Sequence, residues 1–426
     1  MSTSAAVDEV DISNKGGTFA SMKFRNFRLF FTGQLISQIG NWLTLVAQTL
    51  LVLRLTNSGV AVGFLAACQF LPVLLFGAWA GLVADRSDKR VLLIIVQSFA
   101  MLQSFALASL AFMHHPPVAA IFGVALAGGF ATAFDNPARR AFVVEMVPTD
   151  HVTNAVSLNS ALMTGSRIVG PALAGLLITT VGFGWCFLLD GISYLAVIAG
   201  LWMMRPSELR ASTPTPRSKG QVRAGLRYAR SIPELWVPLV MMAIVGTLAF
   251  NFTVVMPLFV KRSLHGTDTT FTLVYSVVSV GSLVAALITA RRARTTTHHV
   301  VVGATGFGIA LLAFAASPVL SVAFPMALLV GFTSILFMTA STAIVQVRSD
   351  PAMRGRVLAL QAIVFLGTTP IGGPLLGWVC QQFGARVGFA VGGVACLVAA
   401  AWGHVASRDQ RVAALRPETG DLHLAG

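Results

Sequence analysis

The sequence has 426 residues, of which 55% are hydrophobic and only 11% are charged, and its mean hydropathy is +0.77. A soluble domain of this length does not reach that hydropathy, so the composition predicts a protein with many membrane-spanning segments. The formal net charge of +14 would also suit a nucleic-acid-binding protein. The basic residues, however, alternate with apolar runs and form no separate basic domain, which argues against nucleic acid as a partner.

The first 26 residues form a polar N-terminal tail that contains Asp8, Glu9 and Asp11. This tail lacks the apolar centre of a cleavable signal peptide. We therefore expect the first membrane-spanning helix to direct the chain to the inner membrane.

Twelve apolar runs have the length and the lack of charge that a membrane-spanning helix needs. They are continuously apolar, which favours helices over the alternating strands of a barrel and predicts an all-α membrane protein. The runs are 27–53, 59–84, 91–113, 118–134, 155–180, 185–204, 235–260, 273–290, 300–316, 320–345, 357–379 and 387–405.

The basic residues predict the orientation of these helices. All but five of the 30 Lys and Arg lie in the two tails and in alternate connections, which the positive-inside rule assigns to the cytoplasm together with both termini. Four of the exceptions lie in the opposite connections, and the fifth lies inside a span. They are Arg54, Lys261, Arg262, Arg386 and Arg167.

The longest connection divides the spans into two sets of six, at 27–204 and 235–406, with a C-terminal tail at 407–426. This cytoplasmic linker, 205–234, contains a Ser/Thr/Pro-rich piece at 212–218. A basic amphipathic stretch follows at 220–232, which suits a helix on the inner leaflet. Regulation by lipid or by a partner is an alternative role for this linker.

The central charge, Arg167, lies near the middle of the fifth run. A central arginine costs roughly 2.5–3.5 kcal/mol to insert, so such residues face a protein interior or a water-filled cavity. Pro171 removes the backbone donor that would pair with the Arg167 carbonyl, which predicts a bend there. Gly170 and Gly175 allow a neighbouring helix to approach closely.

A related pattern recurs about 200 residues later, as expected for a duplicated half. The eleventh run contains Pro370, Gly373, Pro374 and Gly377, which predict a second bend, but it carries no charge. Paired interruptions of this kind in two halves are the best sequence indication of a substrate-lining site.

Between the second and third runs the chain reads G-L-V-A-D-R-S-D-K-R, residues 81–90. This segment resembles the signature cytoplasmic loop of the major facilitator superfamily. Asp88 departs from the pattern by replacing the loop glycine. The positions that match, and that the resemblance identifies as a gating loop, include Gly81, Asp85, Arg86, Lys89 and Arg90.

The G-S-R-I-V-G-P-A-L-A-G segment at 165–175 resembles the antiporter motif of exporters in the same superfamily. Residues 136–142 and 225–230 are similar to the subgroup of enterobactin exporters and drug exporters. The resemblance implies two pseudo-symmetric six-helix bundles and export of small, partly apolar compounds by alternating access. It also implies a proton gradient as the energy source and no cofactor.

The residue that carries the proton is open. Members of the subgroup often have a carboxylate in the first helix, where this chain has Asn41, which cannot titrate. Asp135 and Asp190 remain as candidates, since a carboxylate that moves into a low-dielectric site binds a proton more tightly. Asp135 could instead form a helix-end ion pair with Arg139 or Arg140, and Asp190 could be a structural hydrogen-bonding residue. Arg167 could bind an anionic substrate group or stabilise a nearby carboxylate, or it could join helices through a buried partner.

Polar residues inside the spans are candidates for the substrate cavity. Four polar residues of the first run follow helical spacing and so form one stripe: Gln34, Gln38, Asn41 and Gln48. Helix-to-helix hydrogen bonds would explain the same residues. The candidates are Gln34, Ser37, Gln38, Asn41, Gln69, Asn159, Asn251, Tyr275 and Gln361.

Other classes of function have less support. The chain contains no ATP-binding loop and no catalytic constellation, and its four cysteines suit neither a metal site nor a disulfide framework. A lipid or lysolipid flippase on the same fold and a non-transporting membrane sensor are the alternatives. We expect a monomer that contacts a small-molecule substrate, protons and membrane lipid.

Overall fold

A computed structural model describes residues 17–210, 221–289 and 296–415, and within these ranges the chain is helical with no strand. Twelve helical segments are long and apolar enough to cross a membrane, which confirms the predicted number. The helices of the first half are α1 (Arg25–Thr56), α2 (Gly59–Arg86), α3 (Lys89–Ala111), α4 (Val118–Glu145), α5 (Val152–Thr180) and α6 (Phe183–Trp202).

The second half also has six spans, two of which are interrupted. One consists of α8 (Pro233–Leu248), α9 (Phe252–Leu258) and a π-helical turn, Phe259–Ser263; another consists of α13 (Pro351–Leu366) and α14 (Thr369–Phe383). The remaining spans are α10 (Asp268–Thr289), α11 (Thr297–Ala316), α12 (Leu320–Arg348) and α15 (Ala385–Leu415).

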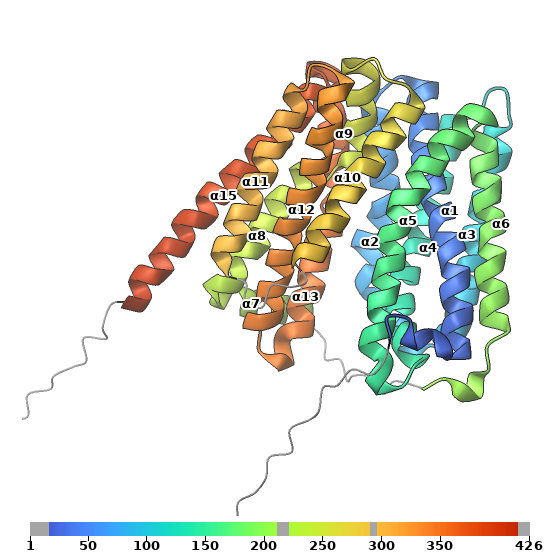
Figure 1. Cartoon of the computed structure of the whole chain (residues 1–426), viewed down its shortest axis with the longest axis horizontal. Helices are drawn as coiled ribbons and strands as arrows, with labels where there is room; N and C mark the ends of the chain where they lie inside the picture. The colour runs from blue at the N-terminus through green and yellow to red at the C-terminus, as the bar shows by residue number, and fades with distance from the viewer. Residues whose placement is uncertain (1–16, 211–220, 290–295, 416–426) are drawn as a thin grey trace, which may run out of the picture.

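Figure 1 shows the two halves as two bundles. In the N-terminal bundle α1 packs against α6 and α2 against α4, while in the C-terminal bundle α10 packs against α12 and α11 against α15. The bundles meet where α2 packs on α14 and α5 packs on α10. Their ribbons lie side by side at the upper end of Figure 1 and diverge toward the lower end.

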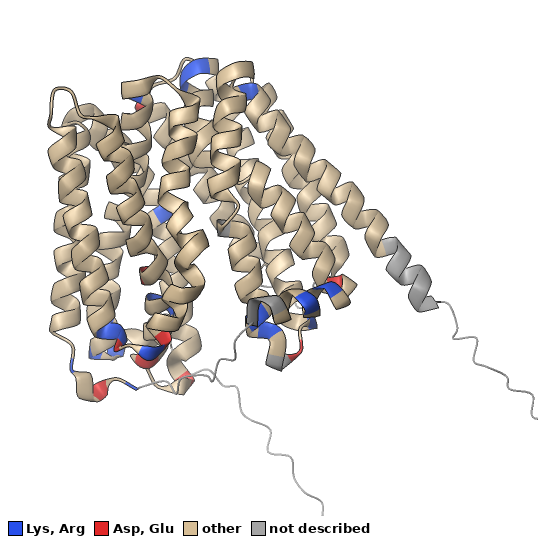
Figure 2. Ribbon diagram, turned by 180° about the vertical axis from the view of Figure 1, so that it is seen from behind, with Lys and Arg blue, Asp and Glu red and all other residues tan. Residues whose placement is uncertain are grey.

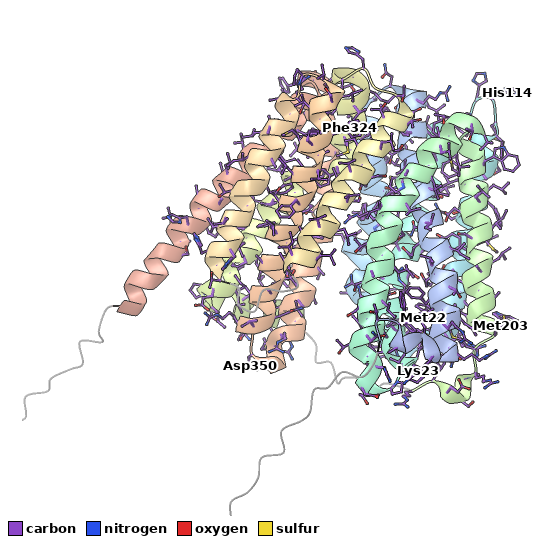
Figure 3. All side chains as sticks on the ribbon, viewed as in Figure 1. Met22, Lys23, His114, Met203, Phe324 and Asp350 are labelled. Carbon is purple, nitrogen blue, oxygen red and sulfur yellow. The ribbon has the colours of Figure 1, made fainter. Side chains whose placement is uncertain are left out.

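The two ends of the molecule differ in charge. Lys23, Met203 and Asp350 mark one end in Figure 3, and His114 marks the other. Charged segments gather at the Lys23 end, which we call the basic end (Figure 2). We call the opposite end, where the bundles lie together, the tight end.

The interruptions do not coincide fully with the predicted bends. α5 is one continuous helix with Pro171 inside it. The break between α13 and α14 falls at residues 367–368, just before Pro370, while Pro374 lies inside α14. The break after α8 was not expected from the sequence. There Asn251 Nδ2 donates to the Thr247 carbonyl (2.7 Å), so a side chain replaces a backbone donor of the helix.

The predicted amphipathic helix is present as α7 (Gln221–Ser231). It packs against α13 and α8. Its Ala229 is fully buried, and the Tyr228 hydroxyl accepts a hydrogen bond from the Asp350 backbone N–H (2.9 Å). The linker helix therefore docks on the basic end of the C-terminal bundle.

Some predicted features lie outside the described residues. They are most of the N-terminal tail, the Ser/Thr/Pro-rich piece 212–218, the basic residues Arg291, Arg292 and Arg294, and the chain after residue 415. The last helix, α15, continues to Leu415 and so includes the first part of the tail predicted at 407–426.

Candidate functional site

A polar cluster around Asp135 and Arg139 lies inside the N-terminal bundle, toward the basic end of α4. The two side chains form an ion pair one helical turn apart, with Arg139 Nη2 at 3.2 Å from Asp135 Oδ2. The Arg139 side chain is only 7% exposed and the Asp135 side chain 15%. This ion pair is therefore largely buried, unlike a solvated pair at a helix end.

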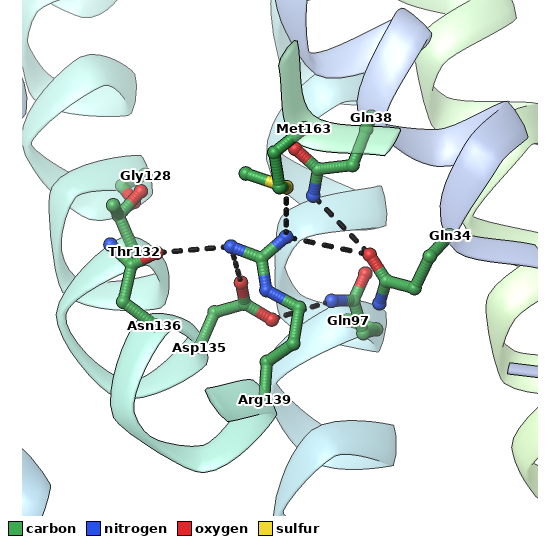
Figure 4. Close-up of polar contacts among 9 residues, drawn as sticks. All are labelled: Gln34, Gln38, Gln97, Gly128, Thr132, Asp135, Asn136, Arg139 and Met163. Carbon is green, nitrogen blue, oxygen red and sulfur yellow. Dashed lines mark hydrogen bonds and ion pairs between the residues drawn. The ribbon is translucent and has the colours of Figure 1, made fainter. Parts of the chain in front are cut away.

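Three other helices contribute to this cluster, as Figure 4 shows. Gln97 of α3 donates from Nε2 to Asp135 Oδ1 (2.7 Å). Arg139 Nη1 reaches Gln34 Oε1 of α1 (3.5 Å) and Met163 Sδ of α5 (3.4 Å). The cluster thus connects α1, α3, α4 and α5.

The polar groups of the cluster are not saturated. Gln34 Nε2 and Gln97 Oε1 are buried and have no hydrogen-bond partner in the described part of the chain. Gln34 Oε1 also accepts from Gln38 Nε2 (3.3 Å). A side-chain amide can donate a hydrogen bond from its N–H group to a carboxylate. If the amide group rotates by 180°, its oxygen can instead accept a hydrogen bond from a protonated carboxyl group.

Arg167 lies on α5 one turn after Met163, and its side chain is exposed. Its guanidinium carbon is 5.3 Å from the centre of the Trp42 ring on α1. The Trp42 ring is in turn 6.0 Å from the ring of Tyr275 on α10, which belongs to the other bundle. Next to this group, Ser276 Oγ donates to the Ile168 carbonyl (3.0 Å), so Arg167 lies where the two bundles meet.

Asp190 has a different environment. It is fully buried in α6 and accepts hydrogen bonds from Thr44 Oγ1 (2.6 Å) and Ser104 Oγ (2.8 Å), both on Oδ2. These contacts join α6 to α1 and α3 within one bundle. Contacts of this kind are those that the structural alternative for Asp190 predicts.

Lys89 and Arg90, the first two residues of α3, contact other helices of their own bundle. Lys89 forms a buried ion pair with Glu145 at the end of α4 (2.7 Å). Arg90 donates to the carbonyls of Leu201 (2.6 Å) and Trp202 (3.1 Å) at the end of α6.

The residue that replaces the loop glycine has a capping role. Asp88 has a φ of −60° and accepts from the Val91 N–H (3.1 Å), so it is the N-cap of α3 and a glycine is not required. Of the other matching positions, Asp85 and Gly81 are partly buried in α2, and Arg86 is exposed.

The glycines of the two related motifs allow helices to approach closely. A Cβ atom on Gly170 would meet Trp42, and one on Gly175 would meet Thr272 of the other bundle. On the second interface, Gly373 and Gly377 of α14 lie against Gly63 and Gly59 of α2. Both glycine pairs of the motifs therefore serve close packing, including packing between the bundles.

The polar residues proposed for a substrate cavity lie in several places. Gln48 Oε1 accepts from Gln69 Nε2 (2.9 Å), and Gln361 Nε2 donates to Ser341 (3.3 Å) and Thr342 (3.2 Å), so these residues join neighbouring helices. The other candidates are buried Ser37 and Asn251, partly buried Asn159 and exposed Asn41.

Sequence reasoning gave too little weight to some residues that the structure brings together. From the sequence, Arg139 is only a possible helix-end partner of Asp135, and no pattern singles out Gln97, Trp42 or Met163. The i, i+4 spacing of Asp135 and Arg139 was visible in the sequence. No local signal connects them to Gln97 or Gln34, which lie on other helices.

Comparison with known proteins identifies the family. The model of the transmembrane secretion effector family, a major facilitator group, matches residues 16–418. The chain belongs to the major facilitator superfamily. It is therefore a multi-pass membrane transporter and not an enzyme.

The relatives of this transporter include one named as a siderophore transporter and two named as efflux or export proteins. It is 23% identical over 376 residues to the staphyloferrin A transporter of Staphylococcus aureus, covering 87% of this chain and 93% of that one. It is 22% identical to macrolide efflux protein A of Streptococcus pyogenes, with 87% and 94% covered. It is also 22% identical to the enterobactin exporter of Citrobacter koseri, with 82% and 84% covered.

Solved structures show the same fold. A bacterial homologue of the human lysosomal transporter Spinster, in an inward-facing and unoccupied conformation, superposes with a TM-score of 0.72 at 16% identity, covering 90% of this chain and 97% of that one. A peptide transporter of the POT family has a TM-score of 0.75 at 13% identity, with 91% and 95% covered.

Proposed function

We propose that this transporter exports a small, partly apolar compound, of a siderophore or drug type, in exchange for protons. The exporter names of its relatives support the direction and the substrate type. The observation that carries the proposal is the buried Asp135–Arg139 ion pair of α4, whose partners come from three other helices of the same bundle.

The cluster has the chemistry of a proton-binding site. In the ionised state, Arg139 and Gln97 both stabilise the Asp135 carboxylate. Protonation of Asp135 would remove the charge that holds Arg139, so Arg139 would be free to strengthen its contact with Gln34 of α1. A proton would in this way change the contact between α4 and α1.

We propose that the basic end faces the cytoplasm of a bacterial cell, with the chain in its inner membrane and both termini inside. The bundles then lie together at the outer end and diverge toward the cytoplasm (Figure 1). The inward-facing Spinster homologue, which superposes over most of the chain, supports this assignment. Alternating access would require the bundles to rock about the contacts of Arg167 and Tyr275. We expect a monomer that takes up its substrate and exchanges protons within one chain.

The test uses inverted membrane vesicles with an imposed pH gradient and a panel of macrolides and siderophores. The wild-type chain should accumulate at least one compound in an uncoupler-sensitive way, and Asp135→Asn should lose this gradient-driven uptake. Arg140→Gln, an exposed neighbour on α4, is the control and should retain uptake. Uptake that is insensitive to the uncoupler, or that persists in Asp135→Asn, would contradict proton coupling at this site. Movement of a fluorescent lysolipid alone would favour the flippase.

A further inference from the structure

Arg167 is a midspan cation, and two carboxylates inside the same bundle have other partners. Asp135 forms an ion pair with Arg139, and Asp190 accepts hydrogen bonds from two hydroxyl groups. In the described ranges, no ion pair of Arg167 with an acidic side chain is present. The sequence left three roles open for Arg167. Two of them, stabilising a nearby carboxylate and joining helices through a buried acidic partner, find no support in these contacts. Binding an anionic group of the substrate remains.

The surroundings of Arg167 suit a bound organic anion. The Arg167 guanidinium carbon lies over the Trp42 ring, 5.3 Å from its centre, in a cation–π contact. Tyr275 approaches from the other bundle and interacts electrostatically with Arg167. Tyr275 is buried, whereas Trp42 is partly buried and Arg167 is exposed. An aromatic or otherwise apolar body can therefore contact the Trp42 ring while its carboxylate or phenolate accepts hydrogen bonds from the arginine.

The position of Arg167 relates this group to the proton site. Met163, which contacts Arg139, lies on the same face of α5 one turn earlier. An anion held by Arg167 would therefore lie next to the helix face that closes the Asp135 cluster, between the two bundles.

We propose that Arg167, Trp42 and Tyr275 form an anchor for an anionic group on the exported compound, so that the substrate is an apolar or aromatic organic anion. This inference rests on the proposed export function for its place in transport, but binding can be measured separately. The anionic group of the substrate neutralises the positive charge of Arg167. A site of this kind prefers an anion over its neutral isostere.

The test compares naphthoate with naphthamide, its neutral isostere, by titration calorimetry on the full purified chain. The wild-type protein should bind naphthoate at least tenfold more tightly than naphthamide. Arg167→Gln should lose this preference, and Arg167→Lys should retain part of it because lysine keeps the charge without the bidentate fork. Arg54→Gln is the matched control, since Arg54 also lies over an aromatic ring, that of Phe183, but at the tight end.

Three results would overturn the anchor: a wild-type protein that binds naphthoate no better than naphthamide, an Arg167→Gln variant that keeps the preference, or one that loses both ligands equally. Thermal unfolding of each variant shows whether it is folded. Selective binding that depends on Arg167, combined with no uptake under a pH gradient, would keep the anchor and reject proton-coupled export. The two proposals can therefore fail independently.

Discussion

Arg262 of the C-terminal bundle donates hydrogen bonds to both the backbone carbonyl and the side-chain oxygen of Asn57, the C-cap residue that follows α1 in the N-terminal bundle. Arg262 Nη1 also donates to Gln381 Oε1 (3.2 Å), which accepts from the Gly59 N–H (2.8 Å). Arg262, Asn57, Gln381 and Gly59 form a latch between the bundles at the tight end. Its residues come from positions far apart in the sequence.

Removing the latch should favour opening of the tight end. Hydrogen bonds to charged groups contribute about 1.5–3 kcal/mol when sheltered and less at the surface, so Arg262→Ala should shift the conformational equilibrium roughly tenfold. The measurement is labelling of Thr272→Cys, a buried position against Gly175, by an impermeant maleimide. The four native cysteines are buried and should give little background.

The control for the latch is Arg386→Ala. Arg386 also lies at the tight end, but it donates to the carbonyls of Ala315 (2.7 Å) and Ser317 (2.8 Å) within its own bundle. Arg386→Ala should therefore leave the rate of maleimide labelling at Thr272→Cys unchanged. Equal rates for the two arginine variants would show that the Asn57 contact does not hold the bundles together.

A methyl group on Gly63 should make closure of the tight end less favourable. Its Cβ would meet the backbone of Gly373 across the interface between the bundles, where neither helix has a side chain that can move aside. Overpacking of this kind costs about 1–3 kcal/mol, so Gly63→Ala should slow transport about tenfold or more. Gly165→Ala, where a Cβ meets no atom within 4 Å, is the matched control in the transport assay. Normal transport by Gly63→Ala would contradict closure at this interface.

The Lys89–Glu145 pair should matter for stability. Removing one partner of a buried ion pair costs about 3–5 kcal/mol because the other charge remains buried. Lys89→Met should therefore lower the midpoint of thermal unfolding in detergent, and the double variant with Glu145→Met should recover much of the loss. Arg86→Gln, an exposed position in the same loop, should have little effect. A Lys89→Met chain as stable as the wild type would exclude this role.

Asp190 should stabilise the N-terminal bundle by accepting hydrogen bonds. Asp190→Ala leaves the hydroxyl groups of Thr44 and Ser104 without their acceptor, which costs about 1–3 kcal/mol for each buried group left unsatisfied. Asp190→Asn keeps an acceptor oxygen and should lose less. Thermal unfolding measures both variants, and gradient-driven uptake by the folded Asn variant should persist. Loss of coupling with normal stability would instead move the proton site to Asp190.

The sequence by itself determined the family, the number and approximate position of the membrane spans, and the presence of a charge at Arg167 in the middle of one. These features are local: a span is a continuous apolar run, and the motifs at 81–90 and 165–175 are short segments. The two glycine motifs also predicted close helix approach, which Gly175 and Gly373 show.

Only the tertiary structure decided which polar groups meet. It placed Gln97 and Gln34 around the Asp135–Arg139 pair, whereas Arg167 lies on Trp42 without an acidic partner among the described residues. These partners come from different helices, and helical periodicity fixes the face of a residue on its own helix but not the neighbour it contacts. In the low dielectric of a bundle that neighbour decides whether a charge is stabilised, and so what it can do.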